Sequence, residues 1–78
     1  MEIKVLGPGC AKCHKQYDEA IKAVEEHGLD ATVSKVEALD QIASFGVLFT
    51  PGLVVDGEVI HSGSVLKAAK LAKRLKGA

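Results

Sequence analysis

The chain has 78 residues, which is enough for one small domain with a modest, mostly aliphatic core. Its 10 basic and 10 acidic residues cancel, so the net charge gives no argument for binding to nucleic acid or to a membrane surface. No apolar run approaches the ~20 residues of a membrane span, and the start lacks the pattern of a secretory signal. We therefore expect a single domain over residues 1–78, monomeric and cytoplasmic, with no nucleic-acid or membrane partner.

The first half of the chain has the pattern of a strand, a helix and a strand. A short apolar run at residues 3–6 ends at Gly-Pro-Gly, which predicts a buried strand and a tight loop. Residues 11–27 have apolar positions three and four apart, which predicts a helix that Gly28 closes. The expected inner face of this helix consists of Cys13, Tyr17, Ala20, Ile21 and Val24. Residues 30–36 are rich in β-branched residues and predict an edge strand, parallel to the first.

The second half predicts a short helix, a hairpin and a last helix. Apolar spacing over residues 38–43 predicts the short helix, which stops near Gly46. Asp56-Gly57 lies between two β-rich runs, which is typical of a hairpin with a two-residue type I′ turn. Ser64 is placed to cap the last helix, whose basic residues are predicted to form a solvated face. The expected buried residues of this helix are Val65, Leu66, Ala69, Ala72 and Leu75.

Cys10 and Cys13 stand at the junction between the first loop and the first helix. Unpaired N–H groups and the helix dipole favour a thiolate there, and such positions lower a cysteine pKa from ~8.5 to ~3.5–7.5. Cys13 lies one turn deeper, so we expect Cys10 to attack a disulfide and Cys13 to resolve the mixed disulfide. Lys12, His14 and Lys15 crowd the first turn. Cations oppose the dipole at a helix start, and they make sense if they stabilise an anion.

Two other chemistries fit a cysteine pair. C-x-x-C followed by His14 is the signature of c-type haem attachment, but Met1 is the sole methionine and the three aromatic residues offer little for a haem pocket. A soft metal ion such as Cu(I) or Zn is the stronger alternative. Small copper chaperones carry such a pair at the same place, but they usually have Met where Pro8 stands here. A closed zinc site needs four ligands, which two cysteines do not supply. A soft-metal carrier stays open, as does a redox-inert interaction domain.

Thr50-Pro51 separates these readings, because it stands at the entry to the hairpin after a C-x-x-C at a helix start. With "GPGCAKC" and "TPGLVVDGEV", the chain resembles the thioredoxin superfamily, and within it the small redox-active disulfide proteins. The resemblance implies a thioredoxin-like α/β fold of order βαβαββα, with a four-stranded mixed sheet and helices on both faces. It also implies a thiol–disulfide oxidoreductase without a cofactor, acting on disulfide-containing proteins or small thiols and reduced by a thioredoxin-reductase-like donor.

The resemblance further implies roles for the second motif. The Thr50–Pro51 bond would be cis and pack beside Cys10, and the Thr50 backbone would pair with an extended substrate segment. The chain departs from thioredoxins in having Gly9 before the first cysteine, where they have Trp. Their buried carboxylate below the cysteines also has no clear counterpart, because Lys4 stands on the first strand. Which group assists Cys13 is left open.

Overall fold

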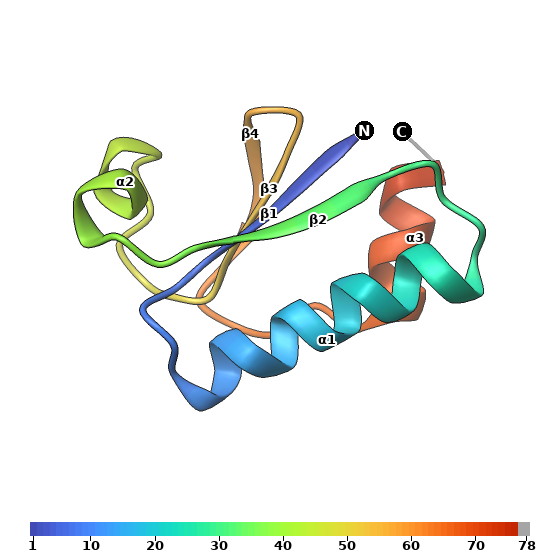
Figure 1. Cartoon of the computed structure of the whole chain (residues 1–78), viewed down its shortest axis with the longest axis horizontal. Helices are drawn as coiled ribbons and strands as arrows, with labels where there is room; N and C mark the ends of the chain where they lie inside the picture. The colour runs from blue at the N-terminus through green and yellow to red at the C-terminus, as the bar shows by residue number, and fades with distance from the viewer. Residues whose placement is uncertain (77–78) are drawn as a thin grey trace.

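The structure is a computed structural model that describes residues 1–76, and it contains the predicted elements in the predicted order (Figure 1). The strands are β1 (Glu2–Leu6), β2 (Thr32–Val36), β3 (Gly52–Val55) and β4 (Glu58–Ser62). The helices are α1 (Ala11–Glu26), α2 (Leu39–Ser44) and α3 (Ala68–Lys76). The predicted domain also includes residues 77–78, which lie outside the described residues, and its extent stays a prediction.

The four strands form one mixed sheet in the order β2-β1-β3-β4. Strand β1 pairs in parallel with β2 and antiparallel with β3, and β4 pairs antiparallel with β3. The parallel pair follows from the return of the chain through α1. Strand β2 lies at the edge, as predicted. The backbone N–H of Gly7 donates to the Val36 carbonyl at 2.9 Å, so this pairing reaches the loop that carries the cysteines.

The hairpin turn is confirmed. Asp56 and Gly57 have φ angles of 49° and 84°, and a type I′ turn requires positive φ at both central residues. The Asp56 carboxylate also accepts a hydrogen bond of 2.7 Å from the backbone N–H of Glu2. The turn is thereby tied to the start of the central strand β1.

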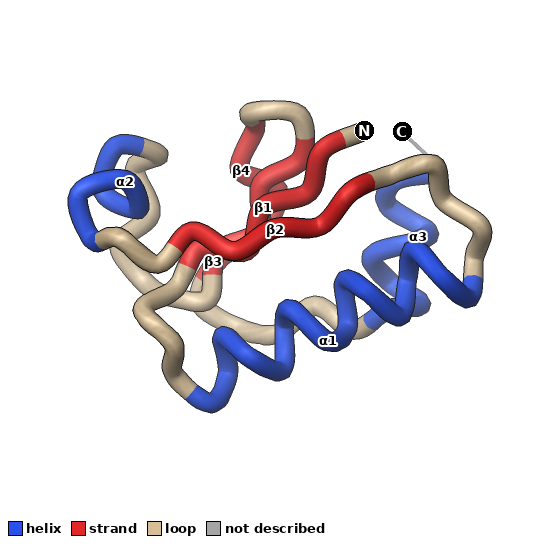
Figure 2. The backbone as a smooth tube through the Cα atoms, in the orientation of Figure 1, coloured by secondary structure: helices blue, strands red, loops and turns tan. Residues whose placement is uncertain are grey.

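Helices cover both faces of the sheet, because side chains alternate along β1. Figures 1 and 2 show α1 and α3 on one side of the strands and α2 on the other. The face toward α1 and α3 has a core of Ile3, Val5, Ala20, Ala23, Leu53, Leu66, Ala68, Leu71 and Ala72. The face toward α2 has a smaller core of Leu6, Ile42, Val47 and Val54. The described residues therefore form the thioredoxin-like α/β fold.

The predicted inner face of α1 is partly wrong. Tyr17, Ile21 and Val24 are only half-buried, whereas Gln16 is 1% exposed and Ala23 is fully buried. Gln16 is buried because its side chain amide makes two hydrogen bonds to the backbone ahead of α3. The small side chain of Ala23 belongs to the core that α1 shares with α3.

The predicted start of the last helix is also wrong. Helix α3 begins at Ala68, and the Ser64 hydroxyl is hydrogen-bonded to His61 Nε2 at 2.9 Å instead of capping the helix. The reason is that Gln16 occupies both the N–H and the carbonyl of Leu66, which removes that carbonyl from a helical ladder. The buried positions shift accordingly, because Leu71 is buried and Ala69 is exposed.

No helix within residues 1–76 is both long enough and apolar enough to cross a membrane.

Candidate active site

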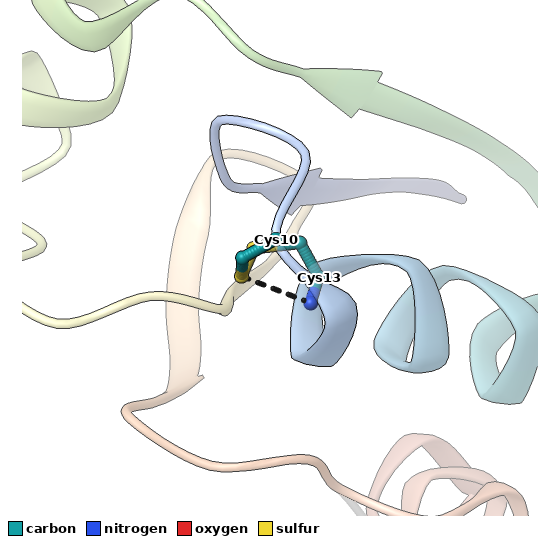
Figure 3. Close-up of a disulfide and its surroundings, with 2 residues drawn as sticks. All are labelled: Cys10 and Cys13. Carbon is teal, nitrogen blue, oxygen red and sulfur yellow. Dashed lines mark hydrogen bonds between the residues drawn. A yellow bond between two sulfur atoms is a disulfide. The ribbon is translucent and has the colours of Figure 1, made fainter.

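Cys10 and Cys13 form a disulfide at the first turn of α1, with their Cα atoms 5.0 Å apart (Figure 3). Cys10 is the N-cap residue, with extended backbone angles of φ −71° and ψ 166°. Its sulfur accepts a hydrogen bond of 3.3 Å from the Cys13 N–H, and its carbonyl accepts one of 3.0 Å from the His14 N–H. The helix start thus holds the two sulfur atoms together and directs an otherwise unpaired N–H group at Cys10.

The two cysteines differ in accessibility. Cys10 lies exposed at the end of the loop, whereas Cys13 is 5% exposed. A partner in solution therefore meets the sulfur of Cys10 first. The same asymmetry was expected from the position of Cys13 one turn deeper in the helix.

Gly7 makes room for the disulfide. A methyl group on its Cα would lie 2.8 Å from Cys13 Cβ, a separation that real side chains do not tolerate. The same methyl group would lie 3.8 Å from Thr50 Cβ. Gly7 is therefore the point where the first strand, the buried cysteine and the second motif converge. The sequence pattern indicates only that this glycine belongs to a loop.

The Thr50–Pro51 peptide bond is cis. Pro51 is fully buried and Thr50 is half-buried beside Gly7. The Pro51 carbonyl accepts a hydrogen bond of 3.0 Å from the Gly63 N–H, which ties this loop to the end of β4. The structure thus brings Thr50 close to the buried cysteine, while direct packing of Pro51 against Cys10 stays a prediction.

The surroundings of the disulfide are positively charged on the helix side. Lys12, His14 and Lys15 are all exposed, and the first turn of α1 has no acidic residue. Large apolar side chains are exposed just before the second motif, since Leu48 and Phe49 are 89% and 73% exposed. Neighbouring exposed apolar side chains of this size are typical of a contact surface.

A carboxylate that the sequence did not identify lies near the buried cysteine. A small pocket of about 10 Å³, roughly the room of one water molecule, is lined by Val5, Gly7, Gly9, Cys13, His14, Lys35 and Glu37. Glu37 is the acidic residue of this set, and it lies across the loop from Gly9. The strand topology is the signal that could have identified Glu37 from the sequence. The carboxyl ends of two parallel strands meet at one edge of a sheet, and residue 37 directly follows the second strand.

The cysteines are also the residues that a soft metal ion would contact in the reduced protein. Within residues 1–76, no group of three or more His, Cys, Asp and Glu side chains is arranged to hold a metal ion. A metal on this pair would therefore have two protein ligands from the described part of the chain.

Comparisons with known proteins agree with this geometry. A family profile described as "Thioredoxin domain" matches residues 1–76. A thioredoxin of Methanothermobacter thermautotrophicus is 40% identical over 75 residues, which cover 96% of this chain and 97% of the relative. A thioredoxin of Methanocaldococcus jannaschii is 36% identical over 74 residues, which cover 95% of this chain and 85% of the relative. With its disulfide at a helix start, this chain belongs to the thioredoxin family and is a thiol–disulfide oxidoreductase.

Proposed function

We propose that Cys10 is the nucleophile and Cys13 the resolving cysteine in disulfide exchange with protein substrates. The observation that carries this assignment is the exposed Cys10 sulfur at the N-terminus of α1, backed by a Cys13 that is 5% exposed. A thiolate at Cys10 gains the N–H groups and dipole of the helix start, which favour the charged form. Cys13, in contrast, is buried, so in this scheme it reacts with the Cys10 sulfur after the mixed disulfide has formed.

The reaction balances with two cysteines. The Cys10 thiolate attacks one sulfur of a substrate disulfide, and the other sulfur leaves as a thiolate that takes up a proton. Cys13 then loses its proton and attacks Cys10, which releases the second substrate sulfur as a thiol. The substrate gains two electrons and two protons, and the protein closes the Cys10–Cys13 bond. The reverse sequence oxidises a substrate dithiol.

Thr50 and Pro51 are the proposed substrate-binding residues. The burial of Pro51 and its hydrogen bond to Gly63 tie this loop to the end of β4. In this proposal the Thr50 backbone pairs with an extended segment on either side of a substrate cysteine, which the position of Thr50 near Gly7 and the buried cysteine supports.

The proposal extends to partners. Disulfide-containing proteins are the substrates, a thioredoxin-reductase-like protein is the electron donor, and the chain acts as a monomer in the cytoplasm. The names of the two relatives support this general scheme, because both are thioredoxins. A reducing compartment also suits a pair whose disulfide is transient and catalytic.

Cysteine variants test the order of attack. Cys10→Ser and Cys13→Ser are compared with the unchanged chain in the reduction of insulin disulfides with dithiothreitol as electron source. We expect Cys10→Ser to lose turnover, and Cys13→Ser, mixed with insulin in the absence of dithiothreitol, to accumulate a mixed disulfide that mass spectrometry detects on Cys10. Turnover by Cys10→Ser would refute the assignment.

A redox titration separates this function from soft-metal transport. The state of the pair is read by alkylation of metal-free protein, and a reversible two-electron transition between ~−180 and ~−290 mV is expected. Tight binding of one Cu(I), with no reversible disulfide in that range, would favour the metal carrier instead.

A further inference from the structure

A groove of about 290 Å³ lies between the first turns of α1 and the segment that leads into α3. Its walls are Lys12, Lys15, Glu19, Ser64, Val65 and Lys67. Lys12 stands between the two cysteines in the sequence, so one wall of the groove begins on the helical turn that carries the reactive pair. The opposite wall follows Gly63, whose N–H is hydrogen-bonded to Pro51. The two walls of the groove therefore continue along the chain into the two parts of the active site.

Buried hydrogen bonds fix the two walls at their present separation. Gln16 Oε1 accepts from the Leu66 N–H at 2.7 Å, and Gln16 Nε2 donates to the Leu66 carbonyl at 3.0 Å. Glu19 Oε1 accepts from the Ala68 N–H at 2.9 Å. These three bonds join α1 to the segment before α3. The backbone segments that carry the lysines of the two walls are thus joined before any partner arrives.

The groove has a clear charge preference. Three of its six lining residues are exposed lysines, and the one acidic residue already uses a carboxylate oxygen to cap α3. The half-buried side chain of Val65 supplies an apolar surface between the charges. This set of groups complements carboxylates carried on a chain with apolar parts, as in an acidic polypeptide segment.

We propose that this groove binds Asp or Glu side chains next to the cysteine of a disulfide partner, and so selects acidic protein segments. The inference rests on the proposed function, because a partner whose sulfur reaches Cys10 must cover the adjoining surface. Exposed ion pairs give each lysine an effect of about 1.5- to 5-fold in rate. The Debye length, over which such charges interact, shrinks from ~30 Å at 0.01 M salt to ~3 Å at 1 M salt.

Matched peptide disulfides test the proposal. Each is a symmetric dimer of acetyl-Gly-X-Cys-X-Gly-amide, in which X is Glu, Gln or Lys. Single-turnover reduction by the reduced protein is followed at 0.01 M and 1 M salt. Each rate is divided by the rate with dithiothreitol under the same conditions, because charges beside a cysteine change its intrinsic reactivity. We expect the normalised rate for the Glu peptide to exceed that for the Gln peptide about threefold or more at low salt.

Variants locate the effect on the groove. Lys67→Gln removes a groove cation outside α1, so the electrostatics of the cysteine helix change little. It should lower the preference for the Glu peptide about 1.5- to 5-fold. Lys67→Glu should shift the preference toward the Lys peptide. Lys73→Gln is the matched control, because Lys73 is exposed on α3 and does not line the groove.

The outcomes separate the two proposals. Equal normalised rates for the three peptides, or equal effects of Lys67→Gln and Lys73→Gln, would overturn the docking inference and leave disulfide exchange intact. A preference that persists unchanged at 1 M salt would also overturn it, because screened charges would not be its cause. If no peptide is reduced at all, the proposed function fails and the docking inference fails with it.

Discussion

The substitution Gln16→Met tests the hydrogen bonds that join α1 to the segment before α3. Methionine has nearly the shape of glutamine but offers neither the donor nor the acceptor that Leu66 uses. Gln16 is 1% exposed, so water does not replace the lost partners. The backbone N–H and carbonyl of Leu66 would then be left unpaired in the interior.

The expected cost follows from two unpaired groups. Each buried donor or acceptor left without a partner costs about 1–3 kcal/mol, which sums to about 2–6 kcal/mol. Burial of the more apolar methionine side chain offsets part of this loss, so we expect a net destabilisation of about 2–4 kcal/mol. That is a large share of the ~5–15 kcal/mol that keeps a typical domain folded.

Urea unfolding of the oxidised protein measures this cost, with Gln41→Met as the matched control. Gln41 is exposed on α2, so the control should stay within ~0.5 kcal/mol of the unchanged protein. Hydrogen exchange adds a local readout, because the Leu66 amide should lose protection only in Gln16→Met. A cost below ~1 kcal/mol, with the Leu66 amide still protected, would refute the reasoning.

Three further substitutions probe other contacts. Gly7→Ala forces a methyl group against Cys13, so the free energy of unfolding, measured in urea, should fall by about 1–3 kcal/mol. An unchanged urea midpoint would contradict the close approach of Gly7 to Cys13. Asp56→Ala places alanine at φ 49° and removes the bond to the Glu2 N–H, so it should cost about 1–2 kcal/mol, whereas Asp56→Asn should cost less; equal losses would argue against a turn-specific role. Glu19→Ala removes the acceptor for the Ala68 N–H at the start of α3 and should cost about 1 kcal/mol of stability in thermal unfolding. Glu19→Gln keeps an acceptor oxygen and should retain most of that stability. Identical melting curves for Glu19→Ala and the unchanged protein would disprove the cap.

Local patterns in the sequence predicted the elements and the redox motif well. Short-range preferences can be recognised from the sequence without knowledge of the tertiary structure. Examples are the apolar spacing, the Gly-Pro-Gly loop and Asp56-Gly57, which depend on neighbouring residues. The same is true of the asymmetry between Cys10 and Cys13, because it follows from one turn of helix. Thr50-Pro51 was assigned to the site by family resemblance, and its cis bond is present in the structure.

What the sequence alone did not determine depends on contacts between distant segments. Gln16 is absent from the predicted inner face of the first helix, yet it is buried because it bonds to Leu66, which lies 50 residues away in the sequence. Because of that contact, the last helix starts at Ala68 and not after Ser64 as predicted. The same contact joins the two walls of the groove between α1 and the segment before α3. Glu37 and Gly7 line one small pocket with Cys13 because parallel strands end at the same edge of the sheet. Periodicity records which residues prefer an apolar neighbour, whereas only the tertiary structure decides which polar groups find partners in the interior.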